Sequence, residues 1–131
     1  MTSTAEPTGT VDTALAHTRL LLRNNPGLAA EQAGEILKVA PNHPLAMLLL
    51  GTALRLGGDA AGALRVLGPL AATQPNWAAA HYERGLALGD AEQPEAALAA
   101  LRRAVALKPN MPDAWRAIGD HLILGLSLIH I

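Results

Sequence analysis

Apolar residues in this chain fall into blocks of helical length, which short stretches rich in proline, glycine and asparagine separate. Residues 45–56 are almost all apolar and are followed by Gly57 and a second glycine, which can end a helix. Asp59 is suited to cap a second helix that runs to about Thr73. Pro75 then cannot continue that helix. The pattern therefore predicts two helices joined by a tight turn.

The same reasoning predicts helices along the whole chain. Proline suits the first turn of a helix, because an N–H at that position has no partner within the helix. Pro94 and Pro112 are therefore expected to begin helices. Asn24 to Gly27 and the pair Gly89 and Asp90 are expected to be turns. The predicted helices span about residues 11–23, 28–39, 45–56, 60–73, 78–88 and 94–108, and a last one begins at Pro112.

Several residue types recur in one shared register. The dipeptide Pro-Asn begins at Pro41, Pro75 and Pro109, so that the two intervals are equal. Small residues keep this interval, and we expect them where paired helices cross, since a larger side chain would force the backbones apart. They include Gly51, Gly85 and Gly119, then Ala46, Ala80 and Ala114, and the pair Ala63 and Ala97. The chain is thus built from repeated helical hairpins.

Composition agrees with an all-α fold. Of the 131 residues, 27 are alanine and 24 are leucine, whereas phenylalanine is absent. Alanine and leucine lead the scale of helix propensity, and β-branched and aromatic residues that favour strands are scarce. An all-β fold and a disordered chain are therefore excluded. The length predicts one compact unit rather than two domains.

A helix–turn–helix period of 34 residues is that of the tetratricopeptide repeat, and the sequence resembles this family from about residue 10 to 122. The resemblance is weaker before Leu45, where His17 replaces an expected glycine, so that the first unit is interpreted as an atypical capping repeat. Arg84 also departs from the family, standing where an apolar residue usually packs. The matching positions are Leu50, Gly51, Leu54, Ala63, Leu67 and Pro75, then His81, Gly85, Leu88, Ala97, Leu101, Ala104 and Pro109, and finally Trp115, Ile118, Gly119 and Leu122.

The resemblance implies a right-handed helical-hairpin solenoid of about three repeats plus one further helix. The predicted organisation is a flexible segment 1–9, repeat units 10–43, 44–77 and 78–111, a partial unit 112–124, and a hydrophobic tail 125–131. A complete fourth unit would run to about residue 145. Two interpretations of the tail stay open. It is either a native plug over the last helix or a non-native read-through at the end of a truncated gene, in which case the chain is a fragment of a longer protein.

Charge and residue usage restrict the partners. The net charge of −1 gives no field that would attract nucleic acid or an anionic membrane. Cysteine is absent, which fits a reducing compartment, and the N-terminal ten residues lack the basic and apolar regions of a signal peptide. The longest nearly apolar run, residues 122–131, is shorter than the roughly 20 residues of a membrane helix. These features predict a cytoplasmic protein without a membrane partner.

Neither catalytic chemistry nor a cofactor is predicted. No phosphate-binding glycine motif is present, and the serines, Ser3 and Ser127, lie in no nucleophile motif. The histidines show no metal-binding spacing, and we expect His81 to be a packing residue. The carboxylates around Asp90 fit a solvated face. The histidines are His17, His43, His81, His121 and His130. The chain is therefore predicted not to be an enzyme, and to bind no metal and no cofactor.

The resemblance implies a protein–protein interaction module that binds a peptide or a helix in the concave groove lined by the first helices of successive units. The family's carboxylate clamp for a peptide C-terminus is missing, because Ala14, Thr18 and Leu49 occupy its positions. The residues expected toward the groove are Thr18, Leu48, Thr52, Arg55, Tyr82, Leu86, Arg116 and Asp120.

Two further possibilities follow from the sequence. Residues 66–78 and 114–122 resemble the repeats of bacterial tetratricopeptide-repeat sulfotransferases, whose catalytic domain is missing from this chain. The alternative function is therefore the N-terminal repeat region of such an enzyme, with the adjoining domain as the partner of the groove. Apolar surface at the open C-terminal end also favours self-association.

Overall fold

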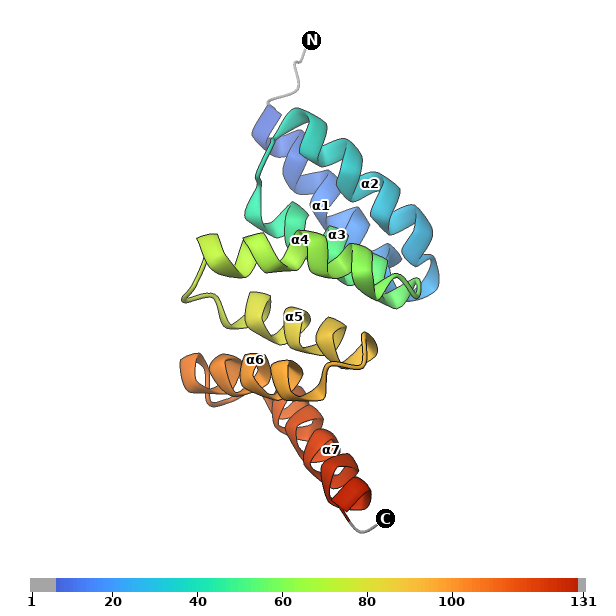
Figure 1. Cartoon of the computed structure of the whole chain (residues 1–131). Helices are drawn as coiled ribbons and strands as arrows, with labels where there is room; N and C mark the ends of the chain where they lie inside the picture. The colour runs from blue at the N-terminus through green and yellow to red at the C-terminus, as the bar shows by residue number, and fades with distance from the viewer. Residues whose placement is uncertain (1–6, 130–131) are drawn as a thin grey trace. The chain divides into compact units, whose positions relative to one another are not determined.

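The structure, a computed structural model, describes the backbone of residues 7–129 and the side chains of residues 10–123. Every regular element in this part of the chain is an α-helix, so the predicted all-α class is confirmed (Figure 1). The helices form hairpins, as the repeat pattern predicts. They are α1 (Pro7–Asn24), α2 (Pro26–Val39), α3 (Pro44–Leu56), α4 (Ala60–Thr73), α5 (Ala78–Asp90), α6 (Pro94–Leu107) and α7 (Pro112–Ile129).

The outer helices are longer than the sequence pattern predicts. Helix α1 begins at Pro7, inside the segment 1–9 that was expected to be flexible, whereas residues 1–6 of that segment lie outside the described residues. Helix α7 continues to Ile129, through most of the predicted non-repeat tail 125–131, whose last two residues also lie outside the described range. Gly125 alone does not end α7, because no proline follows it and the leucines beyond it propagate a helix well.

The turns inside the second and third repeats are equivalent. Gly58 and Glu92, which occupy the same position in these two repeats, both have positive φ, of 93° and 61°. In each turn the N–H of the next residue donates to the carbonyl oxygen five residues back, over 2.8 and 2.9 Å. The turn predicted at Gly89 and Asp90 is therefore wrong, since both residues belong to α5 and the chain reverses two residues later.

Three helices begin with a side chain that caps them. The Asp59 carboxylate accepts a hydrogen bond from the Gly62 N–H over 2.8 Å, which confirms the predicted cap of α4. The Asn25 side chain caps α2 over 3.1 Å in the same way, and Nδ1 of His43 caps α3 over 3.3 Å. Short polar side chains between the helices thus satisfy backbone donors that would otherwise lack a partner.

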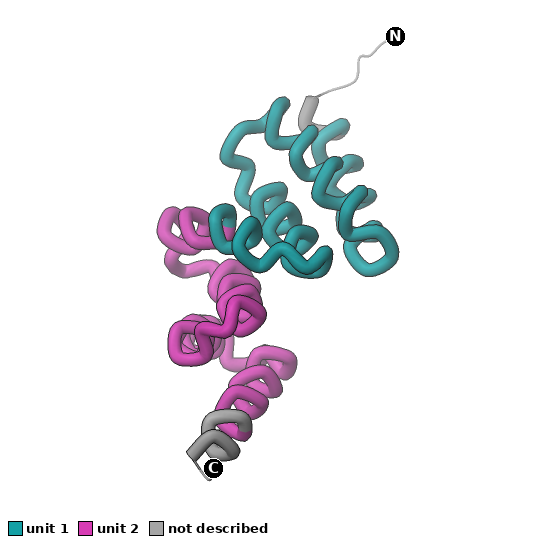
Figure 2. The backbone as a smooth tube through the Cα atoms, turned by 45° about the vertical axis from the view of Figure 1, so that its right-hand side comes forward, with its two compact units in different colours: residues 1–66 teal, residues 67–131 magenta. Residues whose placement is uncertain are grey.

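The helices group into two compact units, residues 1–66 and 67–131, rather than the single unit that the chain length predicts (Figure 2). The boundary falls between Val66 and Leu67, inside α4. The compact units therefore do not coincide with the sequence repeats, whose borders lie between α2 and α3, between α4 and α5, and between α6 and α7.

Unit 1 is held together by an aliphatic core at the meeting point of α1, α2 and α3. Leu15, Ile36, Ala46 and Leu49 are buried there, each no more than 6% exposed. Partly buried side chains, Val11 among them, pack around this cluster. Because α3 contacts both α1 and α2, its burial fixes the first hairpin against the next one.

Unit 2 depends on a close approach of α5 and α6. A Cβ atom added to Gly85 would lie 2.8 Å from Cγ of Leu101 and 3.3 Å from the carbonyl oxygen of Ala97. Leu101 is fully buried and belongs to a core cluster with Ala114 and Ile118 of α7. The crossing role expected for the repeated glycine is thus confirmed at Gly85, where the α5 backbone faces the α6 side chains directly.

We predict that Gly85→Ala lowers the free energy of unfolding by about 1–3 kcal/mol, because the new methyl group overlaps the buried Leu101 side chain. Alanine alone should stabilise a helix by roughly 0.5–1 kcal/mol relative to glycine. Gly34→Ala is the matched control, since nothing lies within 4 Å of a Cβ atom at Gly34 of α2. Urea unfolding of both variants measures the difference, and equal stabilisation by both would refute the crossing.

We also predict that Glu92→Gly raises the free energy of unfolding by about 0.5–1 kcal/mol, since glycine adopts the left-handed backbone of this turn without the penalty of a side chain. Gly58→Ala at the equivalent turn should lower it by a similar amount. Chemical denaturation of the two single variants tests both signs, and a destabilised Glu92→Gly would show that the glutamate side chain stabilises the turn.

Candidate functional site

The first-helix residues that the sequence predicts for a binding groove lie in both units, four in each. In unit 1 they are Thr18 of α1 and Leu48, Thr52 and Arg55 of α3. Thr18 is 0% exposed and Thr52 is 8% exposed, whereas Leu48 and Arg55 are half-buried. Of these four residues, Leu48 and Arg55 are therefore the two whose side chains keep surface that a partner could contact.

Thr18 joins the two helices of the first hairpin. Its hydroxyl oxygen lies 2.8 Å from the carbonyl oxygen of Ala14 and 3.3 Å from Oε1 of Gln32, both of which can accept its proton. The first contact lies within α1 and the second reaches α2. A buried hydroxyl needs such partners, so Thr18 has a structural role that its sequence position did not reveal.

In unit 2 the predicted groove residues divide by exposure. Tyr82 and Leu86 of α5 are half-buried and pack against the unit 2 core. Arg116 and Asp120 of α7 are exposed. Nη1 of Arg116 lies 3.7 Å from Oδ1 of Asp113, and both side chains are about three-quarters exposed, so this ion pair contributes little stability. Charged atoms on α7 and apolar surface on α5 are therefore what this unit offers.

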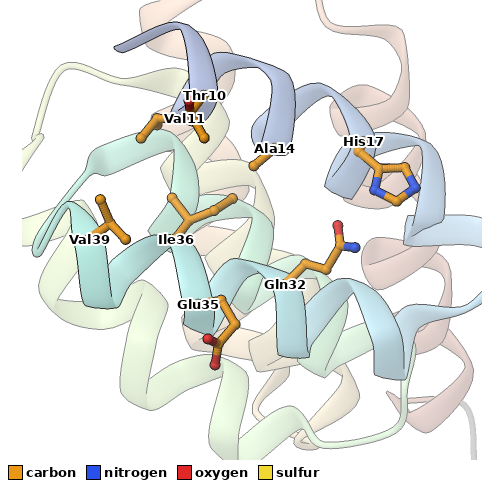
Figure 3. Close-up of a pocket in the computed structure, with 8 residues that line it drawn as sticks. All are labelled: Thr10, Val11, Ala14, His17, Gln32, Glu35, Ile36 and Val39. Carbon is orange, nitrogen blue, oxygen red and sulfur yellow. The ribbon is translucent and has the colours of Figure 1, made fainter. Parts of the chain in front are cut away.

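The structure reveals a concave site that the sequence did not predict, between α1 and α2 (Figure 3). The cavity has a volume of about 490 Å³, within the range of ligand sites. It lies within unit 1 and opens to solvent. Its lining comprises Thr10, Val11, Ala14 and His17 from α1, and Gln32, Glu35, Ile36 and Val39 from α2.

The cavity joins an apolar surface to a polar margin. Ile36 is buried, and Figure 3 shows its side chain directed into the space between the two helices. Val39 is 71% exposed, which is unusual for an aliphatic side chain beside a hollow. Glu35 forms an exposed ion pair with Lys38 over 2.7 Å. Helical spacing predicts that the lining residues lie on the facing sides of α1 and α2. It does not predict how closely the two helices pack, so it does not predict a cavity between them.

The other polar side chains that could suggest chemistry have structural partners. Nε2 of His81 lies 2.8 Å from the carbonyl oxygen of Pro75, and Nε1 of Trp115 donates to the carbonyl oxygen of Pro109 over 2.8 Å. Among the described residues, no group of three or more histidine and carboxylate side chains could hold a metal ion. No helix within the same range is long and apolar enough to cross a membrane.

The sequence profile of the family described as "Tetratricopeptide repeat" matches residues 13–67 and 82–125. These segments include most of α1, all of α2 and α3, the first half of α4, most of α5, and α6 with most of α7. A comparison with curated proteins found no match.

Three solved structures illustrate the similarity of the fold. MamA from Desulfovibrio magneticus is 28% identical, with a TM-score of 0.77 over 92% of this chain and 66% of that chain. An O-GlcNAc transferase from Thermobaculum terrenum is 25% identical, with a TM-score of 0.85 over 92% of this chain and 23% of the enzyme. The Sgt2 TPR domain from Aspergillus fumigatus is 17% identical and shows the fold alone, with a TM-score of 0.87 over 95% of this chain and 85% of that domain. The chain thus spans just under two thirds of MamA and about a quarter of the transferase.

We predict that Thr18→Val lowers the free energy of unfolding by about 0.5–1.5 kcal/mol, because the valine leaves the buried hydrogen-bonding site without its hydroxyl. Thr73→Val is the matched control, since the Thr73 hydroxyl donates to a backbone carbonyl over 3.2 Å at an exposed position. Thermal and urea unfolding compare the two, and an unchanged stability of Thr18→Val would argue against its structural role.

Proposed function

Because this chain belongs to the tetratricopeptide repeat family, we propose that it is a protein-interaction scaffold whose unit 1 holds a segment of a partner protein. The family is generally non-catalytic. One of the solved structures that this chain resembles, that of Sgt2, is named as a TPR domain. A protein or peptide is therefore the class of partner that the family membership supports.

The observation that carries the proposal is the cavity between α1 and α2. Its volume is large enough for one or two side chains of a docked segment, and the apolar surface of Val11, Ala14 and Ile36 favours aliphatic ones. The polar margin formed by Gln32 and Glu35 could then orient the backbone or a basic side chain of the segment. A short apolar helix or strand of a partner fits this chemistry.

The first-helix residues expected from the sequence are kept as a second docking surface within each unit taken by itself. In unit 1, Leu48 and Arg55 retain half-buried side chains that a peptide could contact, and in unit 2 the exposed side chains of Arg116 and Asp120 do so. Thr18, the α1 residue predicted for the groove, is fully buried and offers no surface to a partner, which is why the cavity is the stronger candidate.

A second candidate function is that of a repeat region within a larger enzyme. The similarity to a segment of the O-GlcNAc transferase shows that this arrangement of helices occurs inside a transferase chain. Nothing in the comparisons supports the sulfotransferase alternative in particular. The open reading frame around the gene tests both: a downstream domain with a phosphate-binding loop would favour an enzyme, and its absence would favour the free scaffold.

We predict that Val39→Lys weakens the binding of partner segments about tenfold or more, since it places a charge at an apolar wall of the cavity. The substitution should leave folding intact, because Val39 is 71% exposed and a lysine suits the last turn of α2. Peptides selected from a random displayed library against the purified chain are the probe, and their affinities are measured by fluorescence anisotropy.

Leu20→Lys is the matched control, since Leu20 is 74% exposed on α1 and does not line the cavity. Its peptide affinities should equal those of the unmodified chain. Peptides that lose binding with Arg55→Glu but not with Val39→Lys would assign the site to α3 of unit 1, and peptides that lose binding with Arg116→Glu alone would assign it to α7 of unit 2. A library that yields no binding peptide would contradict the scaffold function.

A further inference from the structure

The side chain that caps α3 is a histidine. Nδ1 of His43 accepts a hydrogen bond from the Ala46 N–H over 3.3 Å. An imidazole ring can accept at Nδ1 only while it is neutral and carries its proton on Nε2. Histidine changes its charge between about pH 5 and pH 8, whereas the amide of Asn25, which caps α2, does not titrate. The start of α3 therefore depends on a group that a change of pH can switch.

The donor that His43 satisfies lies at the core of unit 1. Ala46 is 0% exposed and belongs to the buried cluster that it forms with Leu15, Ile36 and Leu49. Its N–H is in the first turn of α3, where the helix itself supplies no acceptor. Water cannot replace the ring at a fully buried residue, so the loss of this acceptor leaves a buried donor without a partner, which destabilises the folded state.

Protonation of the His43 ring removes the acceptor. Because Nε2 already carries a proton, the second proton goes to Nδ1, which becomes a donor that faces the Ala46 N–H. The ring also gains a positive charge at the N-terminus of α3, where the helix macrodipole disfavours a cation. Both effects act against the folded position of α3, and a ring that turns away from Ala46 loses the cap as well.

The charged side chains around α3 do not offset this effect. Helix α3 packs against α1 and α2, and within the described part of unit 1 no titratable side chain of these helices forms an ion pair or hydrogen bond with the His43 ring. Lys38, which is close to it in sequence, is paired with Glu35 over 2.7 Å. No carboxylate is therefore placed to favour the protonated ring. The side chains concerned are Asp12, His17, Arg19 and Arg23 of α1, Glu31, Glu35 and Lys38 of α2, and Arg55 of α3.

We infer that His43 is a pH-sensitive cap, and that proton uptake by its ring releases the N-terminus of α3 from the core of unit 1. Only the neutral ring caps the helix, so the unfolded chain binds more protons at this residue than the folded chain, and stability falls as the pH is lowered. The device is specific to this repeat, since the equivalent residue of the next repeat, Trp77, makes no capping hydrogen bond with its side chain. It requires no partner, so it stands or fails independently of the proposed function.

The test compares the full chain with two variants by urea unfolding at about pH 8 and about pH 5, followed by circular dichroism. His43→Asn keeps an acceptor that does not titrate, as Asn25 does at the start of α2. Relative to this variant, the unfolding equilibrium constant of the unmodified chain should rise about fivefold from the higher to the lower pH, which is the effect of one lost cap. His43→Ala lacks the acceptor, so it should be about fivefold less stable than the unmodified chain at the higher pH only.

His17→Asn is the matched control, since His17 is exposed on α1 and caps no helix, and its stability should follow the pH as that of the unmodified chain does. Nuclear magnetic resonance gives a readout that needs no variant to fold: the chemical shift of the Ala46 amide proton should follow the titration of the His43 ring. An Ala46 resonance that stays constant over this pH range would overturn the inference. A stability difference between the unmodified chain and His43→Asn that is the same at both pH values would also overturn it.

Discussion

The close approach of two helix backbones at a glycine is the constraint on which the rest of this structure depends. At Gly85 the α5 backbone lies against the side chain of Leu101, with no room for a Cβ atom between them. Such contact is reached only if the second helix begins at a set distance from the first and crosses it at one point. The constant repeat period, the tight turns with a left-handed residue at Gly58 and Glu92, and the proline that follows each second helix all maintain that geometry.

The same constraint accounts for the composition. A helix pair that approaches closely has room for alanine at the crossing and for leucine beside it, which is how Ala97 and Leu101 come to be fully buried. Aromatic rings would hold the backbones apart, and the tryptophan at position 115 lies on the surface of α7 instead. Stability in such a chain comes from many small contacts, since no disulfide or metal is available to the described residues.

Most of the fold could be predicted because proline, glycine and the repeat register mark the helix ends directly. The turn after α5 was predicted at Gly89 and Asp90 because these residue types are typical of turns. The register with Gly58 instead points to Glu92, whose left-handed backbone conformation is not expected of a glutamate. The site was harder to predict. The burial of Thr18 depends on a contact with Gln32 across the hairpin, and the cavity depends on how far apart α1 and α2 pack, and neither distance is encoded in helical spacing. The division into two units falls beside Gly68 and Pro69 inside α4. A proline within a helix removes a backbone hydrogen bond, so at this point the sequence does carry a local signal.

We expect this chain to bind its partners through the same apolar packing that stabilises its fold. The cavity of unit 1 offers a partner apolar contact with a few polar side chains at its margin. It also offers a hollow for the side chains of a docked segment. Partners should therefore be selected by the size of the side chains that they place in the cavity as much as by their hydrophobicity, because a side chain that is too large would force α1 and α2 apart.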